Sequence, residues 1–68
     1  MNLISVEKME SLVTESRPPI QRTILKRVFN KIKQAPDTLT KIRITIDHLG
    51  LSYAQKMFDL SNYPEFEI

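Results

Sequence analysis

The sequence contains no cysteine, no tryptophan, one glycine and one histidine. Without cysteine the chain forms neither a disulfide nor a thiolate metal site, and His48 alone holds no metal unless several carboxylates converge on it. No apolar run exceeds two residues, whereas ~20 are needed to cross a bilayer. The N-terminus also lacks the basic segment followed by an apolar segment that is typical of a signal peptide. We therefore expect a cytoplasmic protein with no membrane span, metal or other cofactor.

Catalytic motifs are missing as well. The sequence has no glycine-rich phosphate loop, and its single histidine has no nucleophile at a motif spacing. Asp47 precedes His48, but adjacent residues of a helix project in different directions, so this pair predicts an ordinary surface histidine. We expect a protein that is not an enzyme.

The short length limits how stable a single core can be. The chain has 68 residues, which we assign to one domain, residues 1–68, with residues 61–68 as a flexible or docking tail. A chain of this size buries only roughly 60% of the surface that its unfolded form exposes. Because disulfides and thiolate-bound metals are excluded, self-association or partner binding remains as a source of stability. We therefore expect a homo-oligomer.

Four prolines and the single glycine divide the sequence into about four segments. The first has apolar residues at helical spacing, and Asn2 or Ser5 can cap its start. The second predicts the clearest helix, which Pro19 begins and Pro36 ends. Its apolar residues occupy one half of a helical wheel, and they are Ile20, Ile24, Leu25, Val28, Phe29 and Ile32.

Residues 41–47 fit either a strand or a helix. Polar and apolar residues alternate there with the period of a strand. A helical stripe of leucine and isoleucine fits as well, with Asp37 or Thr38 as N-cap and Gly50 just after the end. We favour the helix, since it accounts for both ends of the segment. On that helix Ile44 points away from the apolar stripe, which makes it a candidate contact with another chain.

The fourth segment begins with the capping-box pattern of residues 52–55. It predicts a helix from Tyr53 to about Leu60, which Pro64 and the residues before it end. The fold class expected from all four segments is all-α, a small bundle of three or four short helices that self-associates. The alternative is α+β, with residues 41–46 as a strand paired across a dimer.

Positive charge is concentrated in the middle of the chain. Eight of the ten Lys and Arg residues lie between residues 17 and 43, where one Asp opposes them, giving about +7, whereas residues 1–16 sum to −2 and residues 44–68 to −3. Such clustering predicts an anionic partner, DNA first, which cations bind through phosphates. The candidate residues are Arg17, Arg22, Lys26, Arg27, Lys31, Lys33, Lys41 and Arg43. A membrane surface ranks below DNA, because the other segments are apolar enough to cover the stripe. Long basic side chains that border a core and face water, without any partner, explain the same pattern.

Residues 48–52, followed by Gln55, resemble the Gly-Leu-Ser entry into the second helix of helix-turn-helix regulators. This resemblance implies DNA reading and covers about 14 residues. However, Lys56 stands where that motif is apolar, and the acidic, proline-containing residues 63–66 do not suit a recognition helix. We therefore interpret the run as a common junction between two helices.

Aromatic residues gather in the acidic C-terminal third, away from the positive charge. This separation argues against stacking on single-stranded bases. The aromatic residues favour an alternative function, a protein-interaction module that acts as an adaptor or inhibitor through the fourth helix and the tail. Its candidate partner-binding residues are Ile44, Phe58, Tyr63 and Phe66. Tyr63 and Phe66 fit equally well as residues that fold back on the small core.

Overall fold

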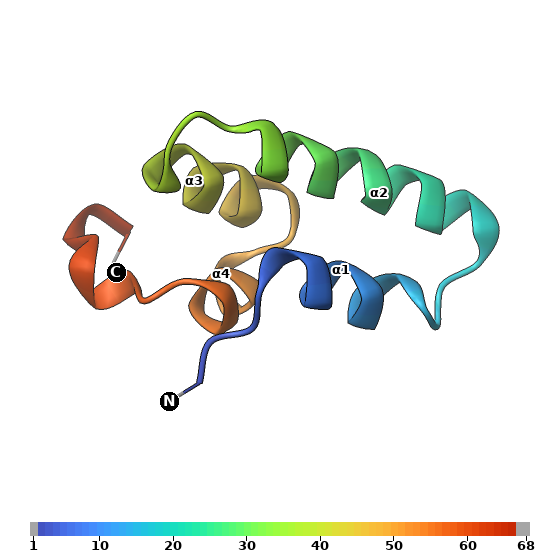
Figure 1. Ribbon diagram of the computed structural model, residues 1–68, viewed down its shortest axis with the longest axis horizontal. Helices are drawn as coiled ribbons and strands as arrows, with labels where there is room; N and C mark the ends of the chain where they lie inside the picture. Colours follow the sequence, from blue (N-terminus) through green and yellow to red (C-terminus); the bar gives the residue numbers. More distant parts are fainter. Residues whose placement is uncertain (1, 67–68) are drawn as a thin grey trace.

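A computed structural model describes residues 2–66 as a bundle of short helices (Figure 1). Its elements are α1 (Val6–Thr14), α2 (Pro19–Gln34), α3 (Thr38–His48), α4 (Leu51–Met57) and two 3-10 turns, η1 (Leu60–Asn62) and η2 (Pro64–Phe66). The described part of the chain contains no strand. The all-α prediction is therefore confirmed. The α+β alternative is wrong, because residues 41–46 lie within α3.

Local capping sets the helix ends that the sequence predicts. The Ser5 side chain accepts a hydrogen bond from the Lys8 N–H at 3.2 Å and so caps α1. Asp37 caps α3 in the same way, accepting from the Thr40 N–H at 2.8 Å. Gly50 follows the end of α3 with φ at 104°, a left-handed conformation that glycine adopts without steric cost. These three positions agree with the prediction.

Helix α1 and helix α2 form an antiparallel hairpin, and α3 returns along the C-terminal part of α2 (Figure 1). Helix α4 then crosses beside the start of α1, where the Ile4 N–H donates to the Lys56 carbonyl at 2.9 Å. The molecule measures 36 × 25 × 19 Å. The connection between α1 and α2 projects at one end of its long axis, and η1 and η2 lie at the other end (Figure 1).

The core consists of two clusters of buried side chains. The first cluster joins α1, α2 and α4 through Met9, Phe29, Ile32 and Met57. The second cluster joins α3, α4 and η1 through Ile42, Ala54 and Leu60. Helix α3 lies between the two clusters, so two of its sides are covered. Its isoleucines face both clusters, and this gives the alternating pattern that also fits a strand.

Ile44 corrects the prediction for α3. It was expected to point away from the core, but its half-buried side chain packs against the first cluster, while Ile46 packs against the second. The expectation assumed a helix with one buried stripe, and α3 has two neighbours instead. Ile44 is therefore a core-covering residue of this chain.

Helix α4 differs from the prediction at both ends. It begins at Leu51 and ends at Met57, and Gly50 is its N-cap without any side-chain hydrogen bond, so the predicted capping box at Ser52 does not form. Phe58 is extended, and the Asp59 side chain accepts from the Ser61 N–H at 3.2 Å. This local acceptor starts η1 and thus ends the helix three residues earlier than Leu60.

Candidate nucleic-acid interface on helix α2

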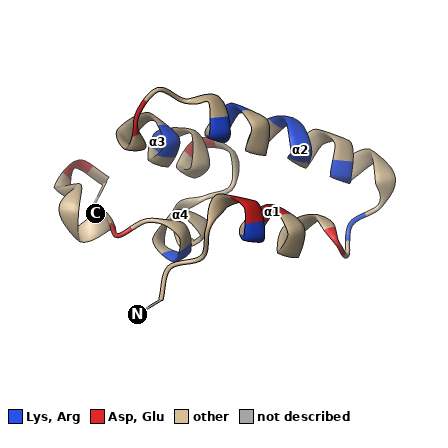
Figure 2. Ribbon diagram, viewed as in Figure 1, with Lys and Arg blue, Asp and Glu red and all other residues tan. Residues whose placement is uncertain are grey.

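Helix α2 carries cations on its exposed surface and no acidic residue along its whole length (Figure 2). Its cations are Arg22, Lys26, Arg27, Lys31 and Lys33, and all five residues are exposed. The acidic residues of the neighbouring elements lie on α1, on α3 and in the connections. The helix thus has a surface of one sign, which the sequence predicts.

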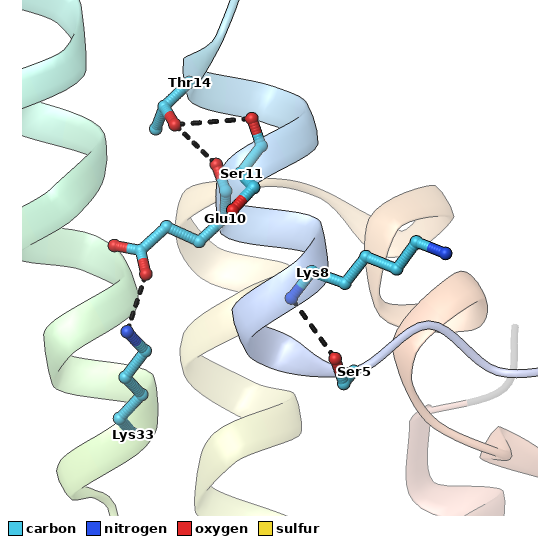
Figure 3. Close-up of polar contacts among 6 residues, drawn as sticks. All are labelled: Ser5, Lys8, Glu10, Ser11, Thr14 and Lys33. Carbon is cyan, nitrogen blue, oxygen red and sulfur yellow. Dashed lines mark hydrogen bonds and ion pairs between the residues drawn. The ribbon is translucent and has the colours of Figure 1, made fainter.

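Lys33 is the one cation of this set that an acidic residue neutralises. Its Nζ lies 2.6 Å from Oε1 of Glu10 on α1 (Figure 3), and this is the single ion pair found among residues 2–66. Glu10 is half-buried, so the pair is partly shielded from solvent. Lys33 therefore joins α1 to α2, and it is less available to a ligand than its neighbours on the helix.

Arg22 and Arg17 lie together at the start of α2. The Arg22 Nε donates to the Arg17 carbonyl at 2.8 Å, and this carbonyl precedes the helix and has no intrahelical partner. Arginine has further N–H donors in the same plane, so this bond leaves Arg22 able to contact an anion. Arg17 itself lies in the connection before Pro18 and is exposed.

The two predicted cations of α3 lie apart from this surface. Lys41 is half-buried, and the Arg43 guanidinium carbon lies 5.9 Å from the centre of the Phe66 ring, within range of a cation–π contact. Of the eight predicted residues, the structure gathers four without an acidic partner along one helix. We call Arg22, Lys26, Arg27 and Lys31 the α2 basic surface.

The residues predicted to bind a protein partner cover the core of their own chain. Phe58, Tyr63 and Phe66 are half-buried against the second cluster, and Phe58 also contacts the first. Tyr63 and Phe66 fold back on the core, which is one of the two expectations from the sequence. Of the predicted tail, residues 61 and 62 belong to η1 and residues 64–66 form η2. Residues 67 and 68 lie outside the described part.

The first half of α2 is uncovered, which its sequence pattern did not indicate. Ile20 and Ile24 belong to the predicted buried stripe, but they are 78% and 55% exposed. Helix α2 has sixteen residues and α3 has eleven, or about 24 Å against about 16 Å. Since α3 starts beside the C-terminal end of α2, it stops before it reaches the first turns (Figure 1). The unequal lengths of the two segments are visible in the sequence, and they could have indicated that α3 leaves part of α2 uncovered.

A shallow hollow lies beside these turns, with a volume of about 240 Å³ and with Arg17, Gln21, Ile24 and Leu25 around it. Arg17 is its only charged residue. The hollow joins the connection between α1 and α2 to the uncovered side of α2. The apolar surface there therefore lies next to a positive charge. None of the residues around the hollow is acidic.

Other candidate chemistry is not assembled in residues 2–66. No group of three or more His, Asp or Glu side chains is placed to hold a metal ion there. His48 is exposed at the end of α3. Hydrogen bonds from Thr40 lower the pKa of Asp37, and hydrogen bonds from Ser61 lower the pKa of Asp59. Asp37 caps α3 and Asp59 caps η1, so both shifts come from local capping hydrogen bonds.

The resemblance to a helix-turn-helix does not extend to a recognition helix in the described residues. Helix α4 follows α3 closely, as in that motif, but it has only seven residues. Residues 64–66 after it form the 3-10 turn η2. A helix that follows α4 and enters the major groove is thus missing from residues 2–66.

Comparison with protein-family models, with curated proteins and with solved structures finds no match to this chain. None of the described helices is long and apolar enough to span a membrane.

Proposed function

We propose that this chain is a non-enzymatic protein that binds an anionic macromolecule, DNA first, through the α2 basic surface. The observation that supports this is a helix with four exposed cations that no acidic residue among residues 2–66 pairs with. Arg22 and Lys26 are four residues apart, and so are Arg27 and Lys31. Like charges at this spacing repel each other on a helix. An anionic ligand removes this repulsion, so its binding also stabilises the helix.

The arrangement suits contact with a phosphate backbone. The α2 basic surface extends over ten residues from Arg22 to Lys31, with the polar residues Thr23 and Asn30 within this span. The nine steps between its ends are about 14 Å along a helix. Cations neutralise phosphates and release counterions, while hydroxyl and amide groups bond to phosphate oxygens. Such contacts carry affinity without sequence preference. We therefore expect binding that depends strongly on salt and weakly on DNA sequence.

The alternative function, a protein-interaction module that uses α4 and the tail, has less support. Its assigned aromatic side chains contact the second cluster of this chain, so a partner would first have to displace them. That displacement exposes apolar surface and costs stability.

A titration against duplex DNA at several salt concentrations tests the proposal. Four phosphate contacts predict a slope of log K against log salt of about −3 to −4. The test variant is Lys26→Glu with Arg27→Glu, and the matched control is Lys8→Glu with Lys56→Glu. The control changes the net charge equally, and its two lysines lie exposed on α1 and α4.

We expect the α2 variant to abolish measurable binding and the control to retain most of it. Circular dichroism checks that both variants stay helical. The proposal is wrong if the wild-type chain fails to bind at low salt. It is also wrong if the two variants weaken binding equally, because net charge and not the α2 basic surface would then explain the affinity.

A further inference from the structure

The exposed isoleucines of α2 share one face of the helix with two of its cations. Ile20, Ile24, Arg27 and Lys31 follow the spacing i, i+4, i+7, i+11, which places them along one stripe. All four residues are exposed, and Ile20 is the most exposed large apolar residue of those described, at 78%. We call this set the tip stripe. It begins at the projecting end of the α1–α2 hairpin (Figure 1).

The chain holds the tip stripe in place. Pro18 and Pro19 restrict the backbone just before Ile20, and Pro19 lies in the first turn of α2. Arg22 ties the start of the helix to the connection through the Arg17 carbonyl. The two isoleucines are therefore presented to solvent by a rigid helix start, where a flexible segment would let them collapse onto the core.

The charges of the tip stripe exclude a second copy as the best occupant. Packing two such stripes against each other brings the cations of both copies together, and α2 has no acidic residue to offset them. DNA accepts the cations, but its phosphate backbone offers no apolar phase to Ile20 and Ile24. A binding partner that matches the whole stripe needs an apolar region for the isoleucines and, directly next to it, an anionic region for the cations.

The surface of an anionic bilayer has these two layers in this order. Along α2, Arg27 lies three residues and Lys31 seven residues beyond Ile24, which is about 4.5 Å and about 10 Å of axial rise. The polar region of one leaflet is roughly 5–8 Å thick. A helix that lies along the interface with the tip stripe facing the bilayer thus places the isoleucines at the acyl chains, while the long side chains of both cations reach outward to the phosphates.

The other groups at the tip allow this approach. Arg17 lies in the connection before Pro18, so it adds a third cation at the same end. Glu15 is the single acidic residue between α1 and α2, and the tip stays positive despite it. The aliphatic stems of Arg27 and Lys31 reach along the apolar surface, while their charged ends meet the phosphates.

We propose that the tip of the α1–α2 hairpin inserts Ile20 and Ile24 into the interface of an anionic lipid bilayer, with Arg17, Arg27 and Lys31 bound to lipid phosphates. The helix lies at the membrane surface and does not span it. This goes beyond the proposed binding of DNA. The two sites share Arg27 and Lys31, but only the membrane site uses the isoleucines.

Co-sedimentation of the full chain with vesicles tests this. One set contains phosphatidylcholine with phosphatidylglycerol, and the other contains phosphatidylcholine alone. The test variant is Ile20→Ser with Ile24→Ser. The matched control is Leu12→Ser with Leu39→Ser, which removes two leucines that are also exposed, at 50% and 38%, but lie on α1 and α3. Circular dichroism verifies that both variants are folded.

We expect the wild-type chain to bind the anionic vesicles and not the neutral ones. The isoleucine variant should lose at least about tenfold in partitioning, since two exposed apolar side chains no longer enter the interface. The leucine control should partition like the wild type. The isoleucine variant should still bind DNA with wild-type affinity, so failure of this inference is distinct from failure of the proposed function.

Three results would overturn the inference. Lack of binding to anionic vesicles at low salt excludes the membrane site. Binding that survives in the isoleucine variant shows adsorption by charge alone, without insertion. A wild-type dimer in sedimentation velocity that the isoleucine substitutions convert to a monomer identifies a second copy as the occupant of the tip stripe.

Discussion

The tail aromatics allow the sharpest test of the fold. Tyr63 and Phe66 pack half-buried against the second cluster, and the η turns hold them there. Fully buried aromatic side chains remove about 150–250 Å² each from water. A half-buried ring removes about half of that area, and burial stabilises the fold by about 25 cal/mol per Å². Because unfolded chains are already partly compact, the area gained on folding is smaller than this. Truncation of either ring to alanine therefore costs about 2 kcal/mol.

This cost is large for so small a domain. A domain of 68 residues has a free energy of unfolding of roughly 3–10 kcal/mol. We therefore expect Phe66→Ala or Tyr63→Ala to lower the melting temperature by about 8–16 °C. The variant that combines both substitutions should be largely unfolded at the low end of this stability range.

Thermal and urea unfolding followed by circular dichroism measure these changes. Leu12→Ala serves as the control, since that side chain is 50% exposed on α1 and its truncation should cost less than either aromatic substitution. If Tyr63→Ala and Phe66→Ala each change the free energy of unfolding by less than about 0.5 kcal/mol, the packing argument fails. The tail would then be free to dock on a partner.

Three further substitutions test local features of the bundle. Gly50→Ala should lower the free energy of unfolding by about 1–3 kcal/mol, because φ is 104° and ψ is 164° there, although a Cβ would meet no atom within 4 Å; urea unfolding measures this. Thr45→Val should be neutral or stabilising in the same assay, since the buried hydroxyl donates only to the Lys41 carbonyl of its own helix, at 2.8 Å. Asp37→Asn should matter near neutral pH and lose its effect in acid. Hydrogen bonds from Thr40 lower the pKa of Asp37, so its contribution is complete above the unfolded pKa, about 3.9, and disappears as the pH falls through the lower folded value. The urea midpoints of the wild type and of Asp37→Asn, measured at about pH 6 and about pH 2, test this direction of the pH dependence.

Helix ends that depend on neighbouring residues were predictable from the sequence. Ser5, Asp37 and Gly50 act through hydrogen bonds or backbone angles within four positions along the chain. The end of α4 was not predicted, although it is local too. Asp59 accepts from the Ser61 N–H, and the sequence pattern fits both this turn and a longer helix. When a helix and a turn have similar local energy, small differences in packing decide which of them forms.

The candidate site was predictable in part. The sequence identified the cations of α2, since their positions on one helix follow from helical periodicity. It did not reveal that Lys33 pairs with Glu10 or that Arg43 lies over Phe66. Those contacts join residues 23 positions apart in both cases, and nothing local specifies them.

The sequence by itself determined the helical class, the main caps and a second helix rich in cations and free of acids. These features depend on composition and on spacing of a few residues. Only the tertiary structure decided which faces are covered. Helices α1, α3 and α4 cover Phe29 and Ile32, but α3 is shorter than α2 and leaves Ile20 and Ile24 in solvent. Coverage depends on where neighbouring helices end in space, and the periodicity of one helix carries no information about that.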